Sequence, residues 1–243
     1  MRVFWILIFF FSLSTVARAD LWQSYEALLQ QHVHPTKIDG VALNAVDYPA
    51  LRKDPNYQQA LKALAAADLA SLKSQEEKLA FYINAYNLLA IAVVEKHWPV
   101  QSIKDVGSLF WPVWKREAGV IAGKTVTLDE VEHQILRSLG EPRIHFAIVC
   151  ASVSCPDLRR EVFRAATLDS QLQDQTQSFL NNTQKGVQQA PEGVRISKIF
   201  SWFSEDFEGG VYEFIYQYRP ELKDEAKGGY LPYNWQVNLL SRK

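Results

Sequence analysis

The chain has 243 residues, of which 48% are hydrophobic and 22% charged, with 26 basic and 27 acidic side chains. A nearly neutral chain of this kind offers no electrostatic reason to bind nucleic acid. Its only two cysteines, Cys150 and Cys155, exclude a scaffold built on several disulfides. Two cysteines also cannot complete a four-ligand structural zinc site by themselves.

The first nineteen residues have the order of a cleavable signal peptide. Arg2 supplies positive charge, Val3 to Leu13 form an almost unbroken apolar run, and Ala17-Arg18-Ala19 ends it. The run is shorter than the roughly 20 residues that span a bilayer as a helix, and no later segment comes close. We therefore expect a periplasmic or secreted protein that does not span the membrane after cleavage, with residues 20–243 forming a single globular domain.

The N-terminal part of the mature chain predicts two amphipathic helices. Apolar residues recur at helical spacing over 20–31 and again over 57–73, and the second segment is rich in alanine and leucine. Three prolines and a glycine lie between them, so we expect that stretch to be loop or short strand.

The strongest helix signal begins at Ser74. Ser74 and Glu77 have the spacing of a capping box, and apolar residues lie on nearly every face from Leu79 to Val94. Such a helix is buried. Asn84 and Asn87 lie on one side of it, and an unpaired buried amide costs about 1 to 3 kcal/mol. Either they hold neighbouring loop backbone, or they face a ligand or a catalytic group.

A hairpin over 119–126 and a helix follow. Thr127 is the expected N-cap of this helix, with Glu130 three residues later, and the helix carries Glu132 and His133 to about Leu139. Neighbouring helical positions point about 100° apart, so Glu132 does not orient His133 directly. His133 is either a partly buried histidine with its hydrogen bonds satisfied or a catalytic base.

Ile144 to Ala151 predicts an apolar strand in the middle of a sheet, and Pro156 the first turn of a helix toward Phe163. In a regular strand His145 and Cys150 point to opposite faces, about 17 Å apart at about 3.3 Å per residue. They would then not form a pair of nucleophile and base, and a thiol there would need a histidine brought close by the fold.

Cys155 is the better candidate nucleophile, because it precedes the expected helix start, where free amides and the helix dipole favour a thiolate. Arg159 would add positive potential one turn later. Three outcomes are open for the cysteines. They form a disulfide, as an oxidising compartment allows; one is an active thiol; or one joins His133 and His145 in a metal site.

The rest of the chain predicts a helix over 168–180, a short strand from Val194, and a helix over 211–218. An acidic and aromatic stretch, Trp202 to Phe207, lies between the last two. Tyr233-Asn-Trp235 stands near the end of the chain.

Several ordered motifs together resemble the family called domain of unknown function 547. The resemblance covers about 75–165, with weaker similarity out to Trp235, and it rests on these blocks: Phe81-Tyr-Ile-Asn-Ala-Tyr-Asn87, Leu128-Asp-Glu-Val-Glu-His133, Ile135-Leu-Arg137, His145-Phe-Ala and Cys150-Ala-Ser-Val-Ser-Cys155-Pro156. The family has no settled activity and names no catalytic residues. The resemblance implies that the amide helix, the Glu-His helix and the cysteine segment belong to one site.

Our first hypothesis is a thiol-dependent hydrolase or acyltransferase of the α+β class, with helices around a small sheet in a papain-like or transglutaminase-like arrangement. The candidate catalytic residues are Cys155 or Cys150 as nucleophile, His133 or His145 as base, and Glu132; Asn84, Asn87 and Arg159 are the substrate-binding or orienting candidates. The familiar thiol enzymes of those folds place the cysteine before the histidine, whereas here both histidines come first.

The alternative is a non-catalytic periplasmic binding or assembly protein in which Cys150 and Cys155 are bridged. Exposed aromatic residues around Trp111 and Trp202 would then form the partner surface. Neither hypothesis calls for a metal or another cofactor, and the expected partner is an unknown small molecule or peptide.

Overall fold

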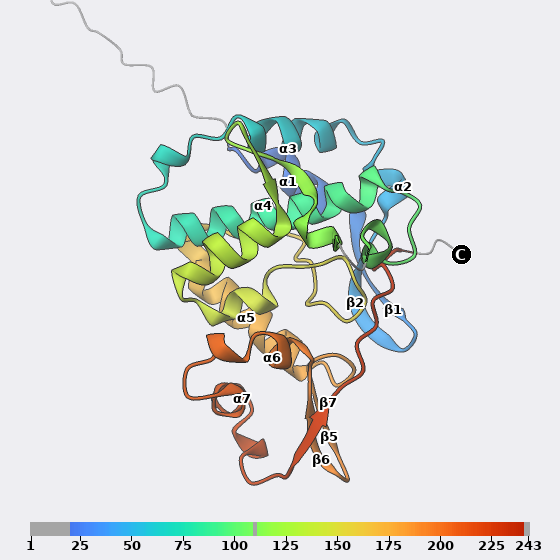
Figure 1. Ribbon diagram of the computed structural model, residues 1–243, viewed down its shortest axis with the longest axis vertical. Coiled ribbons are helices and arrows are strands. Elements are labelled where there is room, and N and C mark those ends of the chain that lie inside the picture. Colours follow the sequence, from blue (N-terminus) through green and yellow to red (C-terminus); the bar gives the residue numbers. More distant parts are fainter. Residues whose placement is uncertain (1–19, 109–110, 241–243) are drawn as a thin grey trace, which may run out of the picture.

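Helices dominate the protein, and its strands form three separate small sheets (Figure 1). The computed structural model describes residues 20–108 and 111–240. The predicted α+β class is confirmed within these ranges. The predicted signal peptide, residues 1–19, lies outside the described residues.

The N-terminal part begins with a helix followed by a β-hairpin. Its elements are α1 (Gln23–His32), β1 (Val33–Ile38), β2 (Val41–Val46), α2 (Tyr48–Leu51), α3 (Pro55–Ala65) and the 3-10 turn η1 (Leu69–Ser71). Asp54 caps α3 by accepting a hydrogen bond from the amide of Asn56, and Pro55 fills the first helical position. The helix predicted over 57–73 therefore begins earlier and ends at Ala65.

Helix α4 (Gln75–Lys96) forms the centre of the structure. The capping box of Ser74 and Glu77 is present, and almost every residue from Leu79 to Glu95 is buried. By length and composition alone α4 could cross a membrane, so the expectation that no later segment comes close was wrong. However, 83% of its apolar window is buried inside the protein, as in the core helix of a folded domain.

The hairpin and helix predicted after residue 119 are both present. Strands β3 (Glu117–Ile121) and β4 (Lys124–Thr127) pair antiparallel, after the 3-10 turns η2 (Ile103–Val106) and η3 (Val113–Lys115). Thr127 and Glu130 form the expected reciprocal capping bonds. The helix that follows has π geometry over η4 (Glu130–Leu136) and ends in the 3-10 turn η5 (Arg137–Leu139).

The strand predicted over 144–151 and the helix predicted from Pro156 are absent. A 3-10 turn, η6 (Pro142–Phe146), is followed by irregular backbone as far as Arg164. The buried amides take the place of a sheet ladder: Asn87 bonds the carbonyl of Ala147 and the amide of Val149, at 3.0 and 2.8 Å. Asn84 bonds Phe163 in the same way. Irregular backbone can be buried here because amide side chains satisfy its polar groups.

The C-terminal part holds the three-stranded sheet, in which β5 and β6 pair antiparallel and β6 and β7 pair parallel. Its elements are η7 (Ala165–Thr167), α5 (Leu168–Asn181), β5 (Val187–Ala190), β6 (Gly193–Ile196), α6 (Ile199–Trp202), η8 (Ser204–Asp206), α7 (Val211–Tyr218), η9 (Pro220–Leu222) and β7 (Lys227–Tyr230). The helices predicted over 168–180 and 211–218 are confirmed, and the strand predicted from Val194 is shorter.

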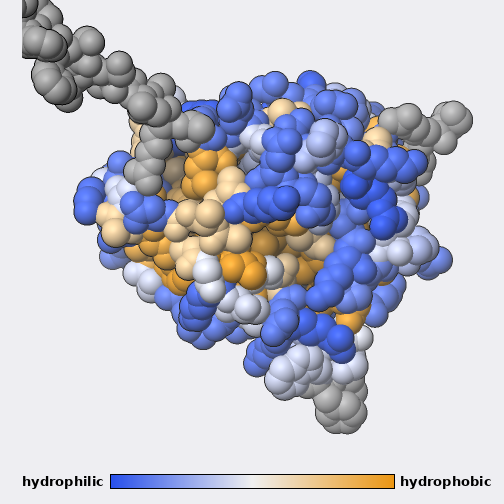
Figure 2. Space-filling view, turned by 90° about the horizontal axis from the view of Figure 1, so that it is seen from above, coloured by the Kyte–Doolittle hydropathy of each residue, from blue (hydrophilic) through white to orange (hydrophobic). Residues whose placement is uncertain are grey.

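Two large hydrophobic cores, beside a small cluster of Val41, Leu43 and Val153, hold the described parts together. The larger surrounds α4, and the smaller is a cluster of phenylalanines around Phe146. Tyr233 packs against both cores, because the chain after β7 runs back from the lower sheet toward the upper helices (Figure 1). On the face that carries α3, a band of hydrophobic residues is exposed between hydrophilic ones (Figure 2).

Candidate functional site

A cavity of about 300 Å³ is lined by residues from widely separated parts of the chain. It collects all five predicted catalytic candidates. Its lining residues are Tyr86, Trp114, Asp129, Glu132, His133, His145, Ile148, Cys150, Cys155, Pro156, Ile199, Trp202, Phe203, Tyr233 and Trp235. The size is at the lower end of the range for small-molecule sites.

Cys150 and Cys155 form a disulfide at this cavity. Of the three outcomes left open by the sequence, this is the one found in the structure. The backbone between them turns through Ala151, which has a left-handed conformation with φ of 59°. Because no helix begins at Pro156, the argument that a helix dipole activates Cys155 was wrong.

Hydrogen-bond donors surround Cys155 in place of a helix terminus. Its Sγ accepts from the amide of Cys150 at 3.1 Å and from the hydroxyl of Ser152 at 3.2 Å. The hydroxyl of Tyr233 lies 3.2 Å from the same sulfur and 3.5 Å from Sγ of Cys150. Burial raises the pKa of Tyr233, so its phenol keeps its proton.

The C-terminal segment holds the cysteine turn in place. The amides of Val153 and Ser154 donate to the carbonyls of Gln236 and Asn234, at 2.9 and 3.2 Å. The amide of Asn234 in turn donates to Oγ of Ser154 at 2.8 Å. These bonds place Tyr233 against the sulfurs. Sequence reasoning assigned no role to Tyr233, and its place in the weaker part of the family resemblance was the one available signal.

Glu132 lies in the cavity wall with a perturbed carboxyl. Burial raises its pKa to about 7, although the hydroxyl of Tyr86, which donates to Oε2 at 3.0 Å, acts in the opposite direction. A carboxyl group with a pKa near neutral both gives and takes protons under ordinary conditions. Its bond to Tyr86 also confirms that Glu132 does not orient the adjacent His133.

His145 is paired with Asp206, which the sequence did not identify. Nε2 of His145 lies 2.7 Å from Oδ2 of Asp206, and the ring stacks on Phe203 with centroids 4.1 Å apart. Burial lowers the pKa of His145 to about 4 despite the carboxylate. The neutral ring that results donates Nε2–H to Asp206 and leaves Nδ1 as an acceptor.

The absence of the predicted strand changes the relation between His145 and the cysteines. A strand would have placed His145 and Cys150 on opposite faces, yet both line the same cavity. Asp206 comes from the acidic and aromatic stretch after α6. Arg137 holds it with two bonds, from Nε at 2.6 Å and from Nη2 at 2.7 Å.

His133 lies at the outer part of the cavity wall, with its side chain exposed. Its Nδ1 is 2.8 Å from Nη1 of Arg137, and its Nε2 is 3.9 Å from a carboxylate oxygen of Asp129. Because arginine is always a donor, Nδ1 acts as acceptor and the ring proton of neutral His133 lies on Nε2.

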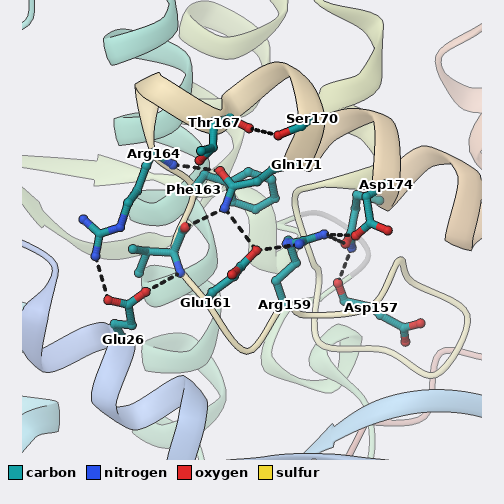
Figure 3. A network of polar contacts seen from close by, with 12 residues as sticks. Glu26, Asp157, Arg159, Glu161, Phe163, Arg164, Thr167, Ser170, Gln171 and Asp174 are labelled. Carbon is teal, nitrogen blue, oxygen red and sulfur yellow. Dashed lines mark hydrogen bonds and ion pairs between the residues drawn. The ribbon is translucent and has the colours of Figure 1, made fainter.

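Asn84, Asn87 and Arg159 are not among the lining residues. The two asparagines bond loop backbone, which was the structural alternative for them. Arg159 bonds Asp174, Glu161 and Gln175 in a polar network on α5 and the loop before it (Figure 3). Its charge is paired there, so it adds no positive potential at Cys155.

Aromatic rings form one wall of the cavity. Trp202, Tyr233 and Trp235 contact one another with ring centroids 4.5 to 5.4 Å apart. Trp202 is 44% exposed, so the wall opens to the surface. Trp111, also exposed, is not part of this wall.

The metal alternative has no ligand cluster in the described ranges, where no three His, Cys, Asp or Glu side chains are placed to hold an ion.

Residues 69–180 match the family described as "Protein of unknown function, DUF547". No curated protein and no solved structure matches the chain. The matched span holds α4, the helix of Glu132 and the cysteine turn, but ends before Asp206 and Tyr233. The chain therefore contains a domain of the DUF547 family.

Proposed function

We propose that this protein is exported and acts as a thiol-dependent hydrolase or acyltransferase, with Cys155 as nucleophile once the disulfide is reduced. The observation that carries the proposal is that one cavity is lined by both cysteines and by His145, whose ring bonds Asp206. A histidine oriented by a carboxylate and facing a thiol is the arrangement that activates cysteine nucleophiles on unrelated folds. The papain-like or transglutaminase-like arrangement stays a prediction.

The residues at the cavity divide the reaction among them. Nδ1 of His145 takes the proton of Cys155, and the thiolate adds to the carbonyl carbon of an acylated small molecule or peptide. The leaving group departs with a proton from His145 or from Glu132, whose pKa near 7 keeps a proton available. Water then hydrolyses the thioester, or an amine or alcohol takes the acyl group.

Reduced protein tests this assignment. We expect Cys155 to be alkylated by iodoacetamide with a pKa below the usual value of about 8.5 for a free thiol. An activated acyl ester should form a thioester on Cys155, and Cys155→Ser should abolish it. In the Cys150→Ser variant, which cannot form the disulfide, acylation should need no reductant. Acylation of Cys155→Ser at the wild-type rate would contradict the proposal.

The second candidate is a non-catalytic binding or assembly protein. The disulfide and the exposed aromatic wall with Trp202 favour it, because a bridged pair has no nucleophile. Acylation of the fully reduced protein, with both thiols confirmed by a thiol count, separates the two. A thioester on Cys155 supports the hydrolase, whereas no thioester on the reduced protein supports the binding protein.

A further inference from the structure

The two sulfurs of the disulfide differ in their surroundings. Both cysteines line the cavity, but Cys150 is half-buried, whereas Cys155 is 2% exposed and accepts an amide hydrogen bond. We propose that this disulfide exchanges with external dithiols that enter the cavity, with Cys150 attacked and Cys155 as the leaving sulfur. This activity is separate from acyl transfer and does not depend on it.

The donors around Cys155 suit a leaving thiolate. Hydrogen bonds to an ionised acceptor are stronger than those to a neutral one, so three donors near Sγ stabilise the thiolate more than the disulfide. The hydroxyls of Ser152 and Tyr233 lie 3.3 Å apart, so while the disulfide is closed the one hydroxyl proton of Ser152 is shared between Tyr233 and Sγ of Cys155. When Cys155 becomes a thiolate, both hydroxyl protons can turn toward it.

Cys150 is the less stabilised sulfur. Its Sγ lies 3.3 Å from the hydroxyl of Ser152 and 3.5 Å from that of Tyr233, farther than Cys155 from each. A sulfur whose thiol has a lower pKa leaves faster in exchange. Attack at Cys150, which also faces the cavity, is therefore the favoured direction.

The disulfide also contributes little to the stability of the fold. It links residues only five apart, and the stabilisation from closing a loop is smallest for short loops. The turn is already held by backbone bonds from Val153 and Ser154 to the C-terminal segment. A disulfide that the fold does not need for its shape is free to open and close.

The exchange balances in two steps. A thiolate of the dithiol attacks Sγ of Cys150, the Cys150–Cys155 bond breaks, and its electron pair goes to Cys155. The second thiol of the dithiol then loses its proton. Its sulfur attacks the other sulfur of the same dithiol, which is bonded to Cys150 in the mixed disulfide, and Cys150 is released. The dithiol is oxidised to a disulfide, and the pair is reduced. One proton ends on Cys150, and the other goes to Cys155 or to solvent, according to the pKa of Cys155.

The test uses the full chain in its oxidised form with dithiothreitol as the dithiol. We expect reduction under native conditions at a rate proportional to dithiothreitol concentration. In a Cys155→Ser variant, oxidised glutathione should give a mixed disulfide on Cys150. Reduction at a rate independent of dithiothreitol, set by unfolding, would overturn the proposal.

Variants of the hydroxyl donors measure the thiolate stabilisation. Tyr233→Phe should shift the equilibrium with glutathione about tenfold toward the disulfide, which is about 30 mV for a two-electron couple. Ser152→Ala should shift the same equilibrium toward the disulfide, and this variant provides the test if Tyr233→Phe does not fold. Tyr82→Phe, away from the sulfurs, is the matched control. Unchanged equilibria in both donor variants would also overturn the proposal.

The His145→Ala variant separates this inference from the proposed hydrolase. It should exchange with dithiothreitol as the wild type does and lose thioester formation. Acyl transfer without exchange in the wild type would count against the inference alone, and retained thioester formation in His145→Ala would count against the hydrolase alone.

Discussion

The irregular segment from Cys155 to Arg164 borders two polar regions that use similar residues differently. On the side of α5, arginines face carboxylates across short distances (Figure 3). Lys185 pairs with Asp157 in the same region. In the cavity, a glutamate, a histidine and a disulfide are held with perturbed pKa values or with hydrogen-bond donors aimed at sulfur. Paired charges fix a loop in place, whereas a carboxyl group with a pKa near neutral, such as that of Glu132, is available for proton transfer.

The most buried charged group of the network region is Lys185, which pairs with Asp157. Lys185 is 2% exposed, and its Nζ lies 2.7 Å from Oδ1 of Asp157. Asp157→Ala would leave a buried charge without its partner, so we expect a loss of about 3 to 5 kcal/mol in the free energy of unfolding. Urea denaturation measures it.

A double variant checks the cause of that loss. Adding Lys185→Met to Asp157→Ala removes the unpaired charge and should recover a large part of the stability. If the double variant is as unstable as the sum of the single variants, the pair is not coupled and the comparison between the regions fails.

The next largest effect concerns Glu132 and pH. Its pKa is raised from 4.5 to about 7 in the folded protein, so the folded state binds the proton more tightly. Stability is therefore lost as the pH rises from about 4.5 to 7, by at most about 3 kcal/mol at 1.36 kcal/mol per unit, and by less where solvent screens the half-buried side chain.

Glu132→Gln removes this titration and keeps an acceptor for Tyr86. The variant should match the wild type near pH 4 and be more stable above pH 7, in denaturation curves collected at each pH. Parallel curves for the two proteins across this range would show that the carboxyl is not perturbed.

Tyr233→Phe should change the free energy of unfolding only slightly, although it changes the thiol–disulfide equilibrium strongly. It removes one hydroxyl bonded to sulfur and to Ser152, so we expect a loss of about 1 kcal/mol, against a tenfold shift in the thiol equilibrium. A loss above about 3 kcal/mol would assign Tyr233 a structural role and place the cavity with the network.

The smallest expected effect is that of Arg164→Met. Arg164 pairs with Asp20 and Glu26, but its side chain is 42% exposed. Exposed pairs contribute about 0.2 to 1 kcal/mol, and salt screens them. The difference from the wild type should shrink in 1 M NaCl.

The parts of the fold that the sequence predicted well have local causes. The capping boxes at Ser74 and Thr127, the apolar run of α4 and the periodic pattern of α5 depend on residues within a few positions of one another. The same holds for the hairpin of β3 and β4. These patterns predict the structure correctly because the residues that form the bonds are neighbours in the sequence.

The prediction for the segment around the cysteines was wrong, because its structure depends on residues far away in the sequence. An apolar run that looks like a strand is irregular, because its backbone bonds side chains from α4, about sixty residues away in sequence. The candidates Glu132, His133, His145, Cys150 and Cys155 were found by chemical type. Asp206, Tyr86 and Tyr233 were missed, because nothing local marks a residue that acts only through distant contacts.

Spacing along the chain was enough to predict most of the helices and the family resemblance, and residue type was enough to find the reactive candidates. The disulfide, the place of His145 at its cavity, and the donors from Tyr233 and Cys150 to Cys155 became known only from the folded structure. Those relations depend on the C-terminal segment returning to the cysteine turn, and hydrogen bonds across eighty residues leave no periodic trace in a sequence.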